Sequence, residues 1–287
     1  MTARAVLRRL SAPLFRMRHA IRKTSEQLRA GLGLSLLRGT SAASRARAID
    51  ALLATPVTTQ TKYGPIRFLN HSTGSQKRAE RLLLKEPDSL KWIDAMLPGS
   101  VFWDIGANIG TLSLYAAARG DLDVWAFEPA AVNYYNLTAN CELNGFTDRM
   151  RCLQLGFGEV NVLATLNVSQ LMPAQSFSFA DKDHPFPVSQ QTAILCTVDD
   201  FIARYGAPCP NYIKIDVPGL TQAILAGAKE TLGRPELKQI QVETNEQSKG
   251  GRQINAALAA FGFEVVARNM KRRGTVQGDL VYGRVSA

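Results

Sequence analysis

The chain has 287 residues, of which 46% are apolar and 20% are charged. This length allows a large buried core, and the composition excludes the collagen, coiled-coil and disordered classes. No run of about 18 uncharged apolar residues occurs, which argues against a membrane-spanning helix. The four cysteines lack C-x-x-C spacing and the three histidines show no i, i+4 pair. We therefore expect no metal site, no disulfide framework and a reducing, cytoplasmic compartment.

The net charge of +10 is concentrated at the amino end of the chain. Residues 1–50 contain eleven Lys and Arg against two acidic residues, a net charge of +9, so the other 237 residues carry only +1. A nearly neutral body lacks most of the electrostatic attraction that nucleic-acid binding requires. We therefore expect that the body does not bind nucleic acid.

Residues 1–60 are predicted to form a basic, partly helical extension. Apolar residues recur at helical spacing between the arginines of residues 14–32. The favoured interpretation is a helical appendage that packs on the body or takes part in a dimer contact. Two alternatives stay open: an amphipathic helix giving peripheral membrane contact through residues 1–50, and a transit peptide.

Residues 61–100 are expected to lead into the core. The pattern predicts a short strand or hairpin at 62–69 and a helix over 80–97 that ends at Pro98-Gly99. Strands and helices then alternate through residues 101–287. We expect strands at 101–105, 124–127, 150–155, 212–216, 238–243, 263–267 and 279–284, with helices at 111–119, 129–143, 220–232 and up to 261.

This alternation predicts one doubly wound α/β domain with helices on both faces of its sheet. Residues 160–198 differ, since short β segments surround a loop rich in proline. We interpret this stretch as an insertion at one edge, where surfaces that bind acceptors are often found.

A glycine loop follows the first core strand. Asp104 ends the apolar run, Gly106, Asn108 and Gly110 follow, and the next helix begins at Thr111. A ligand can approach the backbone at such a helix start, because the glycines carry no Cβ atom. Asn108 stands where a dinucleotide fingerprint has glycine, and asparagine tolerates a left-handed turn.

Two carboxylates at strand ends indicate which ligand the loop holds. Asp104 would repel a pyrophosphate and would attract an ammonium group, while Glu128, at the end of the next strand, can accept ribose hydroxyls. The pair predicts S-adenosyl-L-methionine and argues against a nicotinamide-dependent oxidoreductase. Structural carboxylates on an ordinary strand–helix turn are the alternative.

The sequence resembles the FkbM family of S-adenosylmethionine-dependent methyltransferases over roughly residues 80–285. The matching segments are Lys85–Asp94, Phe102–Gly110, Ala126–Pro129 with Asn133 and Asn140, Thr197–Phe201, Asn211–Val217, Gly227-Ala228 and Gly262-Phe263. The resemblance implies the class I methyltransferase fold, a Rossmann-like sheet of seven strands in the order 3-2-1-4-5-7-6 with an antiparallel last strand. It also implies methyl transfer to a hydroxyl oxygen of a sugar, glycolipid or polyketide-like molecule.

The family's functional positions carry over residue by residue. They would place Asp104, Gly106, Asn108 and Gly110 at the methionine side, Glu128 at the ribose, and Gly156-Phe157 beside the adenine. The family usually continues Ile-Asp-Val with an acidic residue, glycine and a further acidic residue, but here Pro218 and Thr221 leave both carboxylates absent. Either the acceptor differs, or the chain is a catalytically impaired cofactor-binding module.

Methyl transfer from a sulfonium to a hydroxyl needs a positioned acceptor and a nearby base. Asp216, at the end of the fourth strand, is the candidate catalytic base or acceptor-positioning residue. A supporting role beside the cofactor is its alternative. Glu243, His184 and Lys214 are weaker candidates. Asp199-Asp200 is interpreted as the N-cap and first turn of a short helix.

Overall fold

The computed structural model describes residues 41, 55–168, 173–174, 189–270 and 277–284. The chain divides into two compact units, Met1–Leu53 and Ala54–Ala287, and the account below concerns the second. The helix, membrane contact and transit peptide considered for residues 1–50 therefore lie outside the described residues. Within those residues, no helix is long and apolar enough to cross a membrane.

Seven strands form the central sheet, and their carboxyl ends carry the site. They are β3 (Val101–Ile105), β4 (Asp123–Phe127), β5 (Met150–Leu153), β9 (Tyr212–Ile215), β10 (Gln239–Asn245), β11 (Phe263–Met270) and β12 (Gln277–Arg284). Their order is β11-β12-β10-β9-β3-β4-β5, and β12 alone is antiparallel to its neighbours in this sheet. The predicted class I methyltransferase order is confirmed.

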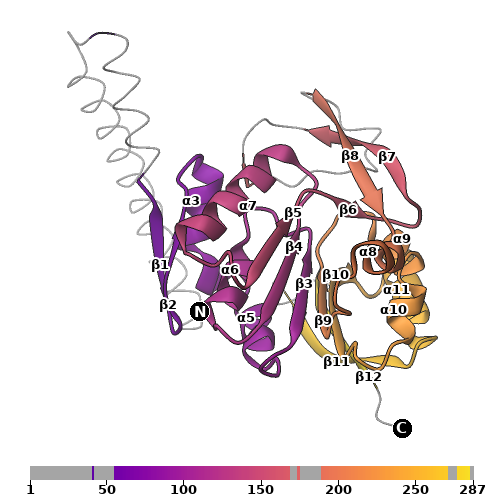
Figure 1. Ribbon diagram of the computed structural model, residues 1–287. Helices are drawn as coiled ribbons and strands as arrows, with labels where there is room; N and C mark the ends of the chain where they lie inside the picture. Colours follow the sequence, from indigo (N-terminus) through magenta and orange to yellow (C-terminus); the bar gives the residue numbers. More distant parts are fainter. Residues whose placement is uncertain (1–40, 42–54, 169–172, 175–188, 271–276, 285–287) are drawn as a thin grey trace, which may run out of the picture. The chain divides into compact units, whose positions relative to one another are not determined.

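Helices cover both faces of the sheet (Figure 1). One face packs against α5 (Pro87–Asp94), α6 (Thr111–Ala118) and α7 (Ala131–Leu143), and the other against α8 (Val198–Tyr205), α9 (Thr221–Ala226), α10 (Lys229–Gly233) and α11 (Lys249–Ala259). The pleat of β3 divides the core accordingly. Phe102 lies in the first cluster of buried side chains, whereas Trp103 and Ile105 lie in the second.

The single helix predicted over 80–97 is wrong. The region forms α3 (Thr73–Glu80), α4 (Leu82–Lys85) and α5, with breaks at Arg81 and Glu86. Pro87 is the first residue of α5, where its missing N–H costs nothing, so the proline starts a helix instead of continuing one.

The single helix predicted over 220–232 is also wrong, because α9 ends at Ala226 and α10 begins at Lys229. At the break, a Cβ atom on Gly227 would lie 2.1 Å from the carbonyl oxygen of Gly158. The close approach of these two backbone segments is a tertiary contact that local periodicity does not report.

Two smaller β structures flank the central sheet. The hairpin predicted near 62–69 is confirmed as β1 (Val57–Thr61) and β2 (Gly64–Phe68). The predicted insertion contributes β7 (Val162–Val168) and β8 (Ser189–Cys196), which join β6 (Gly156–Phe157) in a three-stranded sheet. The loop residues Pro185 and Pro187 lie outside the described residues.

Asparagines of α7 fasten the surrounding segments to the core. The Asn140 side chain accepts a hydrogen bond from Leu69 N (2.7 Å) and donates one to Ile109 O (2.9 Å). Asn144 makes a corresponding pair with both backbone groups of Arg67. One face of α7 thus holds the end of the hairpin and the glycine loop at fixed positions.

Trp103 should be the most sensitive core position. Its ring is fully buried against Phe127, Phe157 and Phe201, yet its Nε1 has no hydrogen-bond partner among the described residues. We expect Trp103→Ala to lower the free energy of unfolding by about 3–5 kcal/mol. Trp103→Phe should cost only about 1 kcal/mol, because it also removes the unpaired N–H. Urea denaturation compares the two, and equal losses would contradict this explanation.

Candidate active site

The loop between β3 and α6 has the left-handed backbone that its sequence predicted. Gly106 and Gly110 have φ of +86° and +87°, and Asn108 has φ of +56°. Asparagine is among the few residues that adopt this conformation at low cost. The expected left-handed turn at Asn108 is therefore confirmed.

The amides of this loop are committed to partners within the chain. Gly106 N and Ala107 N both donate to Phe127 O, at 2.9 and 3.0 Å. Asn108 N donates to Glu128 Oε2 at 2.8 Å, and the amides of residues 109 and 110 donate within the loop. A pyrophosphate is bound by unpaired amides at such a turn. The arrangement therefore argues against a dinucleotide, as the sequence did.

The glycines serve packing inside the chain. A Cβ atom on Gly106 would lie 2.5 Å from Asp216 O, and one on Gly110 would lie 2.6 Å from Leu137 Cδ1. The space that each missing Cβ leaves is thus filled by the chain itself, and not by a ligand as the sequence suggested. Gly106 consequently brings the loop into contact with the end of β9.

Glu128 is buried at the end of β4 and holds two backbone amides. Its Oε2 accepts from Asn108 N and its Oε1 accepts from Ala130 N at 2.9 Å. Burial raises the pKa of Glu128 to about 7, although these hydrogen bonds act in the opposite direction. This carboxyl therefore titrates near neutral pH.

Asp104 lies beneath the loop with only 2% of its surface exposed. Its Oδ2 accepts a hydrogen bond from Ser113 Oγ at 2.5 Å, while its Oδ1 has no hydrogen-bond partner among the described residues. Burial raises the pKa of Asp104, against the lowering effect of the Lys214 charge and the Ser113 hydroxyl. A buried carboxylate oxygen without a donor is costly, and it could accept a hydrogen bond from a bound ligand.

Lys214, a weaker candidate in the sequence, supplies a buried cation to the site. It pairs with Asp104 in the register of β3 and β9, and its side chain is 4% exposed. Its Nζ donates to Asp216 Oδ2 at 3.1 Å, and the Asp216 side chain is 37% exposed. Asp104, its register partner, and Asp216, its hydrogen-bond partner, therefore both act on one buried ammonium group.

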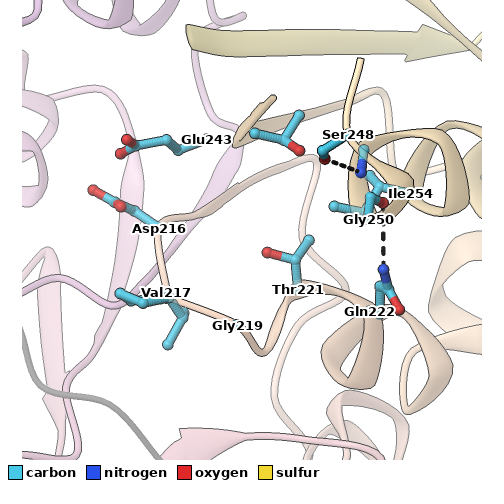
Figure 2. Close-up of a pocket in the computed structure, with 12 residues that line it drawn as sticks. Asp216, Val217, Gly219, Thr221, Gln222, Glu243, Ser248, Gly250 and Ile254 are labelled. Carbon is cyan, nitrogen blue, oxygen red and sulfur yellow. Dashed lines mark hydrogen bonds between the residues drawn. The ribbon is translucent and has the colours of Figure 1, made fainter. Parts of the chain in front are cut away.

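Asp216 and Glu243 come together at a cavity of about 450 Å³ at the ends of β9 and β10. Figure 2 shows both carboxylates directed toward the same side of this cavity. The remaining lining comes from the loop after β9, from α9, from β10, and from α11 with its N-cap: Val217, Pro218, Gly219, Thr221, Gln222, Thr244, Ser248, Gly250, Gly251 and Ile254. We call this cavity the carboxylate pocket.

A second, smaller and largely apolar cavity lies beside the glycine loop. It is lined by Ile105, Gly106, Phe127, Pro129, Leu155, Gly156, Phe157, Val217 and Leu220. Val217 lines this cavity and the carboxylate pocket alike, so the two share a wall. Asp104 lines neither of them. The ring of Phe157 is 1% exposed and packs against Trp103 and Phe127.

The other sequence candidates occupy different positions. Asp199 lies in the first turn of α8, as predicted, and its carboxylate accepts from the amides of Glu230 and Thr231, both at 2.9 Å. The predicted N-cap is wrong, because Thr197 caps that helix by accepting from Asp200 N. His184 lies outside the described residues. Among the described residues, no group of three or more His, Cys, Asp and Glu could hold a metal ion.

The sequence analysis missed the pocket wall that α11 provides. Ser248 caps this helix by accepting a hydrogen bond from Gly251 N at 2.9 Å. A Cβ atom on Gly251 would lie 2.0 Å from Asn245 O, which accounts for glycine there. The sequence does carry a signal for the start of this helix. A serine follows an apolar strand, and a glycine stands three residues after the serine.

Comparison with known proteins agrees with this geometry. The family model described as the methyltransferase FkbM domain matches residues 104–268. The 31-O-demethyl-FK506 methyltransferase FkbM of Streptomyces tacrolimicus is 27% identical over 195 residues, covering 59% of this chain and 75% of that protein. Methyltransferase sdnD of Sordaria araneosa is 27% identical over 199 residues, covering 60% and 76%.

Solved structures are more distant in sequence. Methyltransferase FkbM from Methylobacillus flagellatus KT is 15% identical with a TM-score of 0.47, covering 74% of this chain and 55% of that one. This chain thus spans little more than half the length of that protein. M. capricolum TrmK in complex with S-adenosyl-homocysteine is 12% identical with a TM-score of 0.43, covering 69% and 68%. The family match extends over more than half of the chain, from Asp104 at the end of β3 through the whole of β9 and β10, so the chain belongs to the FkbM family of methyltransferases.

Proposed function

We propose that this protein transfers a methyl group from S-adenosyl-L-methionine to a hydroxyl oxygen of a small molecule, sugar or glycolipid held in the carboxylate pocket. The observation that carries the proposal is the wall that Val217 forms between the small apolar cavity and this pocket. A donor on one side and an acceptor on the other would meet there, at the carboxyl ends of the strands.

The cofactor half is assigned to the loop and the adjoining strand ends. Asp104, Gly106, Asn108 and Gly110 would border the methionine part, and the unpaired Oδ1 of Asp104 offers an acceptor for its ammonium group. Glu128 accepts from two backbone amides and from the Asn133 side chain, and a carboxylate has a further lone pair for a ribose hydroxyl. The apolar lining beside Phe157 matches the faces of an adenine ring in chemistry, and the cavity there, of about 10 Å³, would have to widen to admit the ring.

The acceptor half is assigned to Asp216 and Glu243. Asp216 would accept the hydroxyl proton as the acceptor oxygen forms its bond to the methyl carbon. Glu243, across the same pocket, would orient a second hydroxyl of the acceptor. The name of one relative, 31-O-demethyl-FK506 methyltransferase, denotes a methyl group on oxygen, which supports an oxygen acceptor here.

A second function is a cofactor-binding module that has lost transfer. Pro218 and Thr221, where the family usually has carboxylates, favour it. Thr221 lines the pocket, although only 7% of its surface is exposed. Turnover separates the two functions: formation of S-adenosylhomocysteine in the presence of sugars, glycolipids or polyketide-like alcohols supports the enzyme.

The cofactor assignment predicts that Asp104→Asn weakens binding of S-adenosylhomocysteine at least about tenfold, because an amide attracts the ligand's ammonium group less than a carboxylate does. Isothermal titration calorimetry measures the affinity. Ser113→Ala is the matched control, since it removes the protein donor to Asp104 and keeps the charge. Unchanged affinity in Asp104→Asn, or binding of NAD by the wild-type protein, would contradict the assignment.

The ribose role of Glu128 predicts that the affinity for S-adenosylhomocysteine depends on pH. With a pKa of about 7, Glu128 is mostly protonated at pH 6 and mostly ionised at pH 8 in the free protein. Ribose hydroxyls donate better to the ionised form, so binding should tighten as pH rises through 7, by roughly tenfold between pH 6 and 8. Calorimetry over this range should give a weaker dependence for Glu128→Gln. Identical pH profiles would remove Glu128 from the ribose role.

The catalytic assignment predicts a separation of binding from turnover. Asp216→Asn should keep the affinity for S-adenosylhomocysteine within about threefold and lower kcat by roughly 100-fold, the effect typical of losing a general base. Glu243→Gln, the matched carboxylate on the other strand, should mainly raise KM for the acceptor. Unchanged kcat in Asp216→Asn would assign the base elsewhere.

A further inference from the structure

Lys214 is a buried cation among carboxylates that come from four parts of the chain. Its ammonium donates to Asp216 at the mouth of the carboxylate pocket, and its strand pairs it with Asp104 under the glycine loop. Glu86, at the start of α5, and Asp279, on β12, also act on its charge. A lysine side chain is almost never this buried without such partners.

The balance of charges keeps Lys214 protonated. Burial by itself would lower the pKa of Lys214, but the surrounding carboxylates of Asp216, Asp104, Glu86 and Asp279 raise it above its usual value. Carboxylates from four separate parts of the chain therefore act on one ammonium group. Among them, Asp216 is also the residue whose backbone the loop of Gly106 touches.

We infer that Lys214 is a positioning residue for methyl transfer: its ammonium fixes the Asp216 carboxylate at the pocket and offsets the negative charge next to the cationic donor. The inference rests on the function proposed above, in particular on S-adenosylmethionine as donor. It adds a role in limiting the site's preference for the donor, with its positively charged sulfur, over the product, whose sulfur is neutral.

The chemistry of the reaction explains why such an offset is useful. The S–CH₃ bond breaks and its electron pair returns to sulfur, the acceptor oxygen forms the O–CH₃ bond, and the hydroxyl proton passes to Asp216. The positive charge on sulfur decreases as the reaction approaches the transition state. Carboxylates alone would stabilise the charged donor more than the transition state and would slow transfer. The Lys214 ammonium reduces this imbalance while it orients Asp216.

The test compares the affinities of S-adenosylmethionine and S-adenosylhomocysteine, which differ in the sulfonium charge. Lys214→Met removes one positive charge beside these carboxylates, so it should raise the ratio of donor affinity to product affinity roughly tenfold. Lys214→Arg keeps the charge and should leave the ratio near the wild-type value. Lys229→Met, on the exposed surface of α10, is the control for the same change in net charge.

A purely structural role makes a different prediction. It would weaken both ligands equally in Lys214→Met, and an unchanged ratio in this folded variant overturns the inference. Should Lys214→Met fail to fold, Asp216→Asn replaces it, because that change removes the partly exposed carboxylate of the same pair. The ratio must then fall roughly tenfold, and an unchanged value overturns the inference. If the wild-type protein binds neither compound, the proposed function itself is contradicted.

Discussion

The site depends on the hydrogen bonds that tie the loop after β3 to the end of β4. Phe127 O accepts two loop amides and Glu128 accepts a third. On its other side the loop touches Asp216, because Gly106 has no Cβ atom. The loop after β3 is thereby held between β4 and β9. A movement of this loop would displace the walls of both cavities together.

The pleat of the strands gives the two faces of the sheet different chemistry near the site. Asp104, Lys214 and Gln241 are consecutive register partners on β3, β9 and β10, and all three are buried. Trp103 and Phe127 project to the opposite face, where they pack with Phe157. Charged groups of a ligand are therefore expected on the first side and its apolar ring on the second.

Sequence periodicity predicted individual strands and helices. It did not show the contacts that depend on how distant segments pair. Residues 101–105 form a strand with the expected bounds, since a short apolar run before glycine is typical of a buried parallel strand. The break at Gly227 arises from contact with Gly158, which is distant in sequence. Likewise, Asp104 and Asp216 were found as strand-end carboxylates, but the position of Lys214 beside them follows from the pairing of β3 with β9.

The same pairing bears on the altered acceptor motif. Pro218 and Thr221 remove the two carboxylates that the family usually places after Asp216. However, Glu243, on the adjacent strand β10, lines the same pocket and keeps a second carboxylate facing any acceptor. Asp216 also keeps its ammonium partner, which a module retained only for cofactor binding would not need. The pocket has therefore changed its shape and hydroxyl content more than its charge, and a different acceptor explains the departure better than a loss of transfer does.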